Sequence, residues 1–309
     1  MSSKYSVSEP PRGSPAERRV PGYQAPPRLN REWTGQGAVF LCAVLWSTAG
    51  LFIKLIDWNP LVIAGGRSLV AAVFMAALRF MVPGREKKPF KLSQLWAGGT
   101  AYALTMVLFV VANKMTSAAN AILLQYSAPV WAALFGWVLA GEKPRKAHWI
   151  SLVMVTGGLV LFFRDGLGNG SFAGDSIALA AGIFFGANSA IMRVQKGEPS
   201  DSLLFAHILA AAICVPFALV HPPAFSAESI AAILFLGLIQ IGLASLLFSY
   251  GIKRLPAVQA MLTATAEPVL NPVWVFLAVG ERPPPASIFG GLVIVAAVLV
   301  STLGKPNTS

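Results

Sequence analysis

Ten long apolar blocks, separated by short charged segments, constrain this chain more than any other feature. Each block is close to the roughly 20 residues that a helix needs to cross the hydrocarbon core of a bilayer. Lipid offers no hydrogen-bonding partner, so a spanning backbone must satisfy its own donors and acceptors, and the blocks are too long for barrel strands. The sequence therefore predicts an all-α integral membrane protein with ten transmembrane helices. The blocks run roughly over residues 36–55, 60–82, 93–112, 117–140, 147–164, 173–193, 201–221, 228–250, 257–279 and 286–304.

The charge content also fits a bilayer environment. Only 12% of the residues are charged and 55% are apolar, whereas a soluble domain carries about 25% charged residues. A net charge of +11 could suit a nucleic-acid partner, but most Lys and Arg residues lie between apolar blocks, where they orient membrane spans. We therefore expect the lipid bilayer, and no nucleic acid, as a partner.

The distribution of basic residues predicts the orientation. With the N-terminus placed inside, nineteen of the 24 Lys and Arg residues fall in inner segments, and Arg67 lies within a span. The outer segments hold Lys54, Lys114, Arg164 and Arg282. Because basic residues accumulate in cytoplasmic loops, we expect a multi-pass protein of a plasma membrane of the bacterial inner-membrane type, with both termini in the cytoplasm.

The first 35 residues differ from the rest of the chain. They are rich in Pro, Ser, Arg and Glu and hold almost no branched apolar residues. Such a segment cannot bury enough apolar surface to fold, so residues 1–35 are expected to form a disordered cytoplasmic tail. They do not resemble a signal peptide, because no apolar core follows the start.

The chain resembles itself when it is shifted by 139 residues. Residues 113–144 align with 252–283 without a gap and share nine identities in 32 positions. The shared positions include Pro129 with Pro268, and the pair Gly141-Glu142 with Gly280-Glu281. We therefore expect two five-helix repeats, at 36–164 and 173–304. Since five is odd, the second repeat must enter the membrane from the opposite side, an inverted-repeat architecture typical of alternating-access transporters.

These features resemble the drug/metabolite transporter superfamily, of the EamA type. The resemblance rests on the ten spans, the duplication, and Pro-containing fourth and ninth spans that end in Gly-Glu, and it covers about residues 36–304. It implies a carrier of small molecules. Members of that family include exporters of amino acids and other metabolites, and relatives carry nucleotide sugars, sugar phosphates or cationic drugs.

Two charged residues within spans are candidate substrate-binding residues. Glu267 lies near the middle of the ninth block and Arg67 about two turns into the second. Charges at such depth are costly and usually face a bundle interior or a watery cavity. Glu267 could bind a substrate ammonium group or carry a coupling proton, or serve as a hydrogen-bonded structural acid. Arg67 could meet a substrate carboxylate, or pair with Asp57 or Glu267 in a structural ion pair.

Other polar and aromatic residues are further candidates. Asn188 and His207 could each bond the substrate or join two helices, and the aromatic repeat partners Trp46 and Phe185 could line an apolar cavity or pack. Gln125 and Tyr126 lie one turn before Pro129, and a proline frees the carbonyl four residues back. Bends at Pro129 and Pro268 could therefore expose carbonyls to a central cavity. The Gly-Glu pairs are expected to be helix caps rather than a site.

Other classes of function find little support. The sequence contains no phosphate-binding Gly-Lys-Ser/Thr loop, no metal constellation and no Ser-His-Asp arrangement, so we expect no cofactor, no metal and no enzyme. Cys42 and Cys214 are expected to be packing residues. A channel or a non-transporting scaffold is an alternative outside transport.

The sequence thus favours an exporter of amino acids or similar small metabolites that works by alternating access. The amino-acid class is preferred because an acid and a base, Glu267 and Arg67, could match a zwitterion. Exporters of cationic drugs and carriers of the sugar-phosphate or nucleotide-sugar type are the alternatives.

Overall fold

A computed structural model describes residues 28–54, 56–81, 91–116, 118–164, 167, 171–279 and 285–303. These residues form helices and short connections, with no strand among them. The helices of the first half are α1 (Arg28–Ser47), α2 (Ala49–Lys54), α3 (Pro60–Met81), α4 (Leu92–Met115), α5 (Ala118–Gln125), α6 (Ala128–Ala140) and α7 (Lys146–Phe163). Those of the second half are α8 (Phe172–Val194), α9 (Pro199–Cys214), α10 (Phe217–Val220), α11 (Ala227–Phe235), the π-helix η2 (Leu236–Leu243), α12 (Ala244–Ile252), α13 (Ala257–Ala264), α14 (Ala266–Val279) and α15 (Pro285–Leu303).

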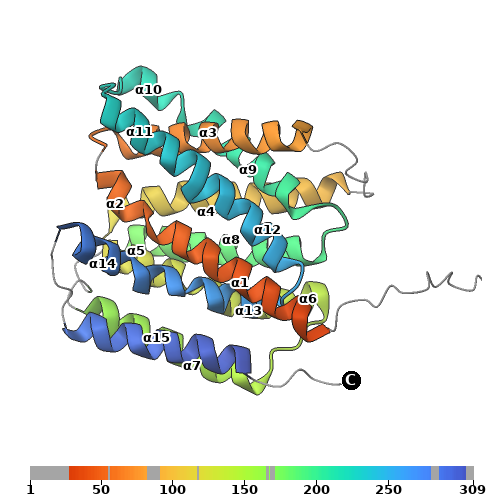
Figure 1. Cartoon of the computed structure of the whole chain (residues 1–309). Helices are drawn as coiled ribbons and strands as arrows, with labels where there is room; N and C mark the ends of the chain where they lie inside the picture. The colour runs from red at the N-terminus through yellow and green to blue at the C-terminus, as the bar shows by residue number, and fades with distance from the viewer. Residues whose placement is uncertain are drawn as a thin grey trace, which may run out of the picture.

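The helices match the apolar blocks of the sequence. Nine segments of the described chain are long and apolar enough to cross a membrane by length and composition. The remaining predicted block, the ninth at 257–279, is occupied by α13 and α14, which are separated by Thr265. The prediction of an all-α protein built from apolar spans is therefore confirmed. Helix α1 begins and α15 ends at the same end of the bundle (Figure 1).

The duplication is visible in the helix boundaries. Helix α5, Ala118–Gln125, coincides with α13, Ala257–Ala264, when the chain is shifted by 139 residues. Helices α6 and α14 follow these two in the same order, and α7 corresponds to α15. Segments that share little sequence thus adopt the same local structure, because both copies carry the same pattern of apolar residues and helix-breaking positions.

The fourth and ninth spans are broken where the prolines predict. Residues Tyr126 and Ser127 separate α5 from α6, and Thr265 separates α13 from α14. Pro129 and Pro268 follow these breaks, and neither can donate a backbone hydrogen bond to the preceding turn. The backbone N–H of Ser127 bonds Leu124 O at 3.1 Å, and that of Thr265 bonds Leu262 O at 3.2 Å. Both breaks therefore tighten into three-residue turns before the second half-helix begins.

Three features depart from the sequence prediction. Helix α1 begins at Arg28, so residues 28–35 are helical rather than part of a disordered tail, and residues 1–27 lie outside the described residues. A helix can extend beyond its apolar block, whose edge marks only where hydrocarbon is expected to begin. The first span also breaks, at Thr48 between α1 and α2, and the eighth contains the π-helical turn η2.

The fifth and tenth spans, α7 and α15, form a close pair along one side of the bundle (Figure 1). The Ser151 hydroxyl donates to Ala297 O at 2.8 Å, and the Ser287 hydroxyl donates to Phe162 O at 2.9 Å. A Cβ atom built on Gly290 would lie 2.5 Å from the carbonyl oxygen of Gly158. Glycine therefore permits a backbone approach that no larger residue would allow, as is common between membrane helices.

Candidate functional site

The two broken spans meet through a pair of polar side chains. The hydroxyl of Tyr126, at the break between α5 and α6, donates to Glu267 Oε2 at 2.7 Å. Glu267 lies in the first turn of α14, just after the break at Thr265. Each residue stands near the middle of its apolar block, so the contact joins the two repeats at mid-depth. The structure thus brings together two residues that the sequence separates by 141 positions.

Arg67 of α3 lies near the same carboxylate. Arg67 and Glu267 are near enough to influence each other through their charges, which places both in the same region of the bundle. The Nε atom of Arg67 is buried and has no hydrogen-bond partner among the described residues. A buried donor without a partner costs about 1–3 kcal/mol. A buried polar atom without a partner calls for an explanation, of which a bound ligand or a water is one.

His207 of α9 extends this region. Its side chain is fully buried, and Nε2 lies 3.0 Å from the hydroxyl oxygen of Ser245 on α12. The Tyr102 ring meets the His207 ring edge to face at 6.0 Å. Nδ1 of His207 is buried with no hydrogen-bond partner among the described residues. The imidazole therefore presents a second unused polar atom to the region around Arg67.

A cluster of aromatic side chains, formed by Trp46, Tyr102, Phe185 and Phe248, packs beside this region. The Trp46 ring lies 5.9 Å from Phe185 and 5.5 Å from Phe248, between ring centroids. Tyr102 contacts Phe185 at 6.1 Å. Trp46, Tyr102 and Phe185 are each less than 10% exposed, so aromatic rings pack tightly beside the polar groups. A solute could reach those groups only if the helices that carry the rings move apart.

Gln240 belongs to this region but was not predicted from the sequence. It lies in η2, is 3% exposed, and donates from Nε2 to Trp46 O at 3.3 Å. Its Oε1 atom is buried with no hydrogen-bond partner among the described residues. The sequence feature that could have identified Gln240 is an amide side chain in the middle of the eighth apolar block. Because π-helical turns often mark functional sites, the local structure identifies Gln240 more clearly than the sequence does.

Two predicted residues make contacts that join helices. The Asn188 amide of α8 donates to Gly98 O of α4 at 2.8 Å, while its Oδ1 atom is buried with no hydrogen-bond partner among the described residues. The carbonyl of Gln125 lies against α8, because a Cβ atom built on Gly182 would be 2.9 Å from its oxygen. That freed carbonyl is covered by a neighbouring helix instead of facing the central region.

The Gly-Glu pair of the fourth span has a role beyond capping. Gly141 adopts φ 66°, as expected for a helix C-terminus, and this turn directs Glu142 toward the second repeat. Glu142 Oε1 lies 2.7 Å from Arg193 Nε, and Glu142 Oε2 accepts from the backbone N–H of Ala257 at 3.2 Å. Arg193 also donates to Lys253 O. The carboxylate therefore caps α13 from the other repeat. The matching pair, Gly280-Glu281, lies outside the described residues.

Among the described residues, no three His, Cys, Asp or Glu side chains gather in a way that could hold a metal ion. Cys42 and Cys214 are buried free thiols, as expected for packing residues.

Comparison with known proteins adds the family. The model of a family described as the EamA-like transporter family matches the chain twice, over residues 33–164 and 172–303. An uncharacterized transporter of Archaeoglobus fulgidus is 24% identical over 279 residues, which cover 85% of this chain and 95% of the relative. The uncharacterized transporter YwfM of Bacillus subtilis is 25% identical, with 85% and 91% covered. A probable terminal-alkyne amino-acid exporter of Streptantibioticus cattleyicolor is 24% identical, with 87% and 94% covered.

A solved structure shares the same fold. A crystal structure of a protein at 22% identity superposes with a TM-score of 0.74 and covers 89% of this chain and 97% of its own. At this identity the likeness concerns the fold alone.

Proposed function

The chain belongs to the EamA-like transporter family, and from this premise we propose that it exports amino acids or similar small metabolites by alternating access. The solute would bind between the two repeats, among Arg67, Glu267, Tyr126, His207 and Gln240. A relative named as a probable amino-acid exporter supports this class of solute. Both termini would lie in the cytoplasm, and the membrane would be a bacterial inner membrane.

The buried Nε of Arg67, unpartnered beside a carboxylate, carries this proposal. A zwitterionic amino acid could engage both groups, since its carboxylate would accept from the guanidinium and its ammonium would donate to Glu267. Gln240 Oε1 and His207 Nδ1 add polar atoms that could bond either group or a polar side chain. A solute with a single positive charge would leave the Arg67 guanidinium without a partner, so a purely cationic drug fits less well.

The aromatic cluster supports a moving rather than an open pathway. Trp46, Tyr102 and Phe185 fill the space beside the polar groups, so a permanent channel would need these rings displaced in the resting state. Two inverted repeats can instead rock about the central site and expose it to each side in turn. Glu267 could also carry a coupling proton in this cycle.

Counterflow in proteoliposomes tests the proposal. Vesicles preloaded with a mixture of unlabelled amino acids are given a labelled tracer, and a carrier is expected to accumulate the tracer with saturable kinetics. Planar-bilayer recording serves as the contrast, because a channel would give conductance. If no amino acid exchanges while lipophilic cations or sugar phosphates do, the proposed class of solute is overturned.

A further inference from the structure

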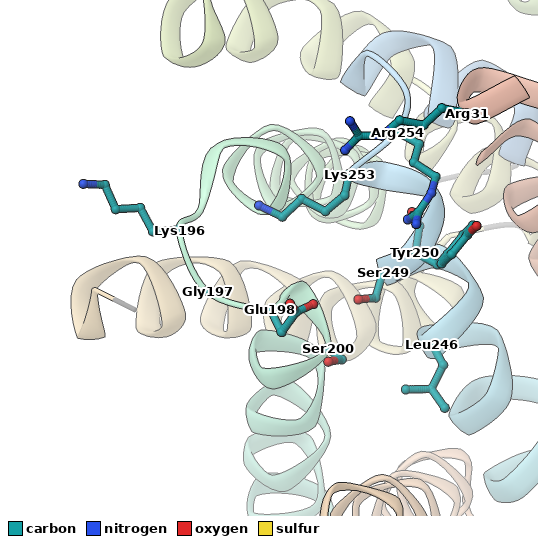
Figure 2. A pocket seen from close by; sticks show the side chains of 10 residues that line it. All are labelled: Arg31, Lys196, Gly197, Glu198, Ser200, Leu246, Ser249, Tyr250, Lys253 and Arg254. Carbon is teal, nitrogen blue, oxygen red and sulfur yellow. The ribbon is translucent and has the colours of Figure 1, made fainter. Parts of the chain in front are cut away.

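A cavity of about 470 Å³ opens at the end of the bundle that carries the Glu142–Arg193 ion pair. Four parts of the chain form its walls, namely the start of α1, the segment that joins α8 to α9, the first turn of α9, and the last turns of α12 with the two residues that follow it (Figure 2). It is lined by Arg31, Lys196, Gly197, Glu198, Ser200, Leu246, Ser249, Tyr250, Lys253 and Arg254. Four of these side chains are basic and one is acidic, so the lining carries a net positive charge.

The basic groups are arranged around the opening. The Arg254 guanidinium lies 3.2 Å from the centroid of the Tyr250 ring and donates to Tyr250 O at 2.8 Å. These two contacts hold the guanidinium in place while leaving its charge uncompensated by either partner. The Lys253 ammonium, just after α12, donates to Gln195 O at the end of α8, whereas Figure 2 shows Lys196 pointing away from the others. Arg31, Lys253 and Arg254 thus set the charge of the cavity, and Glu198 stands opposite them.

Two of the helices that line the cavity, α9 and α12, also carry residues of the central site. Ser249 lies four residues after Ser245 on α12, so the two hydroxyls share one helix face about 6 Å apart along the axis. Ser200 and His207 lie seven residues apart on α9 and also share a face, about 10 Å apart along the axis. Ser245 and His207 contact each other at 3.0 Å. Both walls of the cavity therefore converge on the polar cluster beside Arg67.

We propose that this cavity is a loading vestibule for solute arriving from the basic end of the bundle, and that its basic lining selects solutes that carry a carboxylate or another anionic group. The inference rests on the proposed function, and it adds a filter that acts before the solute reaches Arg67. A positive cleft with apolar walls concentrates anions and speeds their arrival. An amino acid would present its carboxylate first, which is the orientation that the Arg67 guanidinium requires.

Thiol modification measures this selection without any transport step. In the Ser249→Cys variant, the modification rates by an anionic and a cationic methanethiosulfonate are each divided by the rate with a free thiol in solution. The normalised anionic rate is expected to exceed the cationic one by about tenfold at low salt and to lose this advantage as salt screens the charges. Cys42 and Cys214 are at most 1% exposed and do not line the cavity, unlike Ser249 and Ser200, so the parent protein gives the background, and Ser200→Cys on the facing wall provides a second reporter.

Charge removal completes the test. The double variant Arg31→Gln/Arg254→Gln should remove most of the anionic preference, whereas Lys143→Gln/Lys146→Gln, with the same change in net charge among residues that do not line the cavity, should preserve it. Equal normalised rates in the unsubstituted lining would overturn the vestibule. An effect of the arginines that appears only in vesicles containing phosphatidylglycerol, and not in phosphatidylcholine alone, would assign the cavity to a lipid headgroup instead.

The same variants separate this inference from the proposed function. In counterflow with solute supplied at the basic end, Arg31→Gln/Arg254→Gln should raise the KM for a zwitterionic amino acid several-fold and should not raise the KM for its cationic amide derivative. If the anionic reagent reacts faster than the cationic one but no amino acid shows counterflow, the proposed class of solute is overturned and the vestibule is retained. The vestibule alone would be overturned if counterflow were intact, the anionic and cationic reagents modified the thiol at equal normalised rates, and the arginine variant left the KM unchanged.

Discussion

The hydroxyl of Tyr126 donates to Glu267 Oε2 at 2.7 Å, from the helix break of one repeat to the helix break of the other. Shifting the chain by 139 residues places Thr265 at the position of Tyr126, and Ala128 at that of Glu267. The contact therefore breaks the internal symmetry. The pair occurs once, although the pseudo-two-fold symmetry of the repeats would allow it twice. A pair that served only to stabilise the fold would be expected in both positions, so its single occurrence suits a functional site.

Glu267→Gln is expected to abolish saturable counterflow, because the neutral amide no longer attracts a substrate ammonium group. Tyr126→Phe should only weaken the apparent affinity, by about tenfold, since it removes one hydrogen bond to a charged group worth about 1.5–3 kcal/mol. Tracer uptake in proteoliposomes measures both. Full uptake by Glu267→Gln would show that this carboxylate has a structural role and is not needed for transport.

Arg67→Gln should lose transport of carboxylate-bearing solutes while its thermal stability stays level or rises. The reason is that the buried Nε of Arg67 lacks a partner, so the native protein already bears the cost of that unsatisfied donor. Thermal unfolding in detergent measures the stability of the variant, and counterflow measures its transport. A marked loss of stability would instead identify Arg67 as one half of a structural ion pair.

Asn188→Ala should lower stability and spare the KM. Its amide bonds Gly98 O at 2.8 Å, and interhelical hydrogen bonds of this kind contribute about 0.6–2 kcal/mol in membrane proteins. His207→Ala is the informative comparison, because its imidazole faces the proposed site and its loss should raise the KM. If Asn188→Ala raised the KM by as much, the sequence-based assignment of Asn188 to the substrate site would be supported after all.

Gly290→Ala is expected to destabilise the α7–α15 pair by about 1–3 kcal/mol, the usual cost of overpacking. The added Cβ would meet Gly158 O at 2.5 Å and Phe162 N at 2.6 Å, both of them backbone atoms. Gly157→Ala provides a matched control on the facing helix, where a Cβ meets nothing within 4 Å. Thermal unfolding should separate the two variants, and equal melting temperatures would contradict the close approach.

The Glu142–Arg193 pair should show a larger coupling energy than the Arg79–Asp201 pair in double-mutant cycles. Glu142 and Arg193 side chains are 22% and 27% exposed, and Glu142 also bonds the α13 N-terminus. Arg79 is 43% exposed in its 3.2 Å contact with Asp201, a setting in which pairs typically contribute about 0.2–1 kcal/mol. Comparable coupling in both pairs would show that Glu142 does no more than an ordinary surface carboxylate.

The sequence by itself determined the class of fold. Apolar blocks of about 20 residues leave the backbone no choice but helix in lipid, and Pro129 and Pro268 fixed the breaks because proline cannot donate a backbone hydrogen bond. The 139-residue offset also predicted that α5 and α13 would match. These features depend on residues near one another in the chain, which is why composition and spacing were sufficient.

Only the tertiary structure decided which polar residues lie near one another. Glu267, Tyr126 and Arg67 come from three different spans, and nothing in their spacing states that they meet. Asn188 and Gln125 looked equally suitable in the sequence, yet Asn188 is bonded to α4 and the Gln125 carbonyl lies against α8. Gln240 was missed because its position depends on the π-helical turn η2. Helix packing sets which face of each span turns inward, and that depends on the shapes of all the neighbouring helices at once.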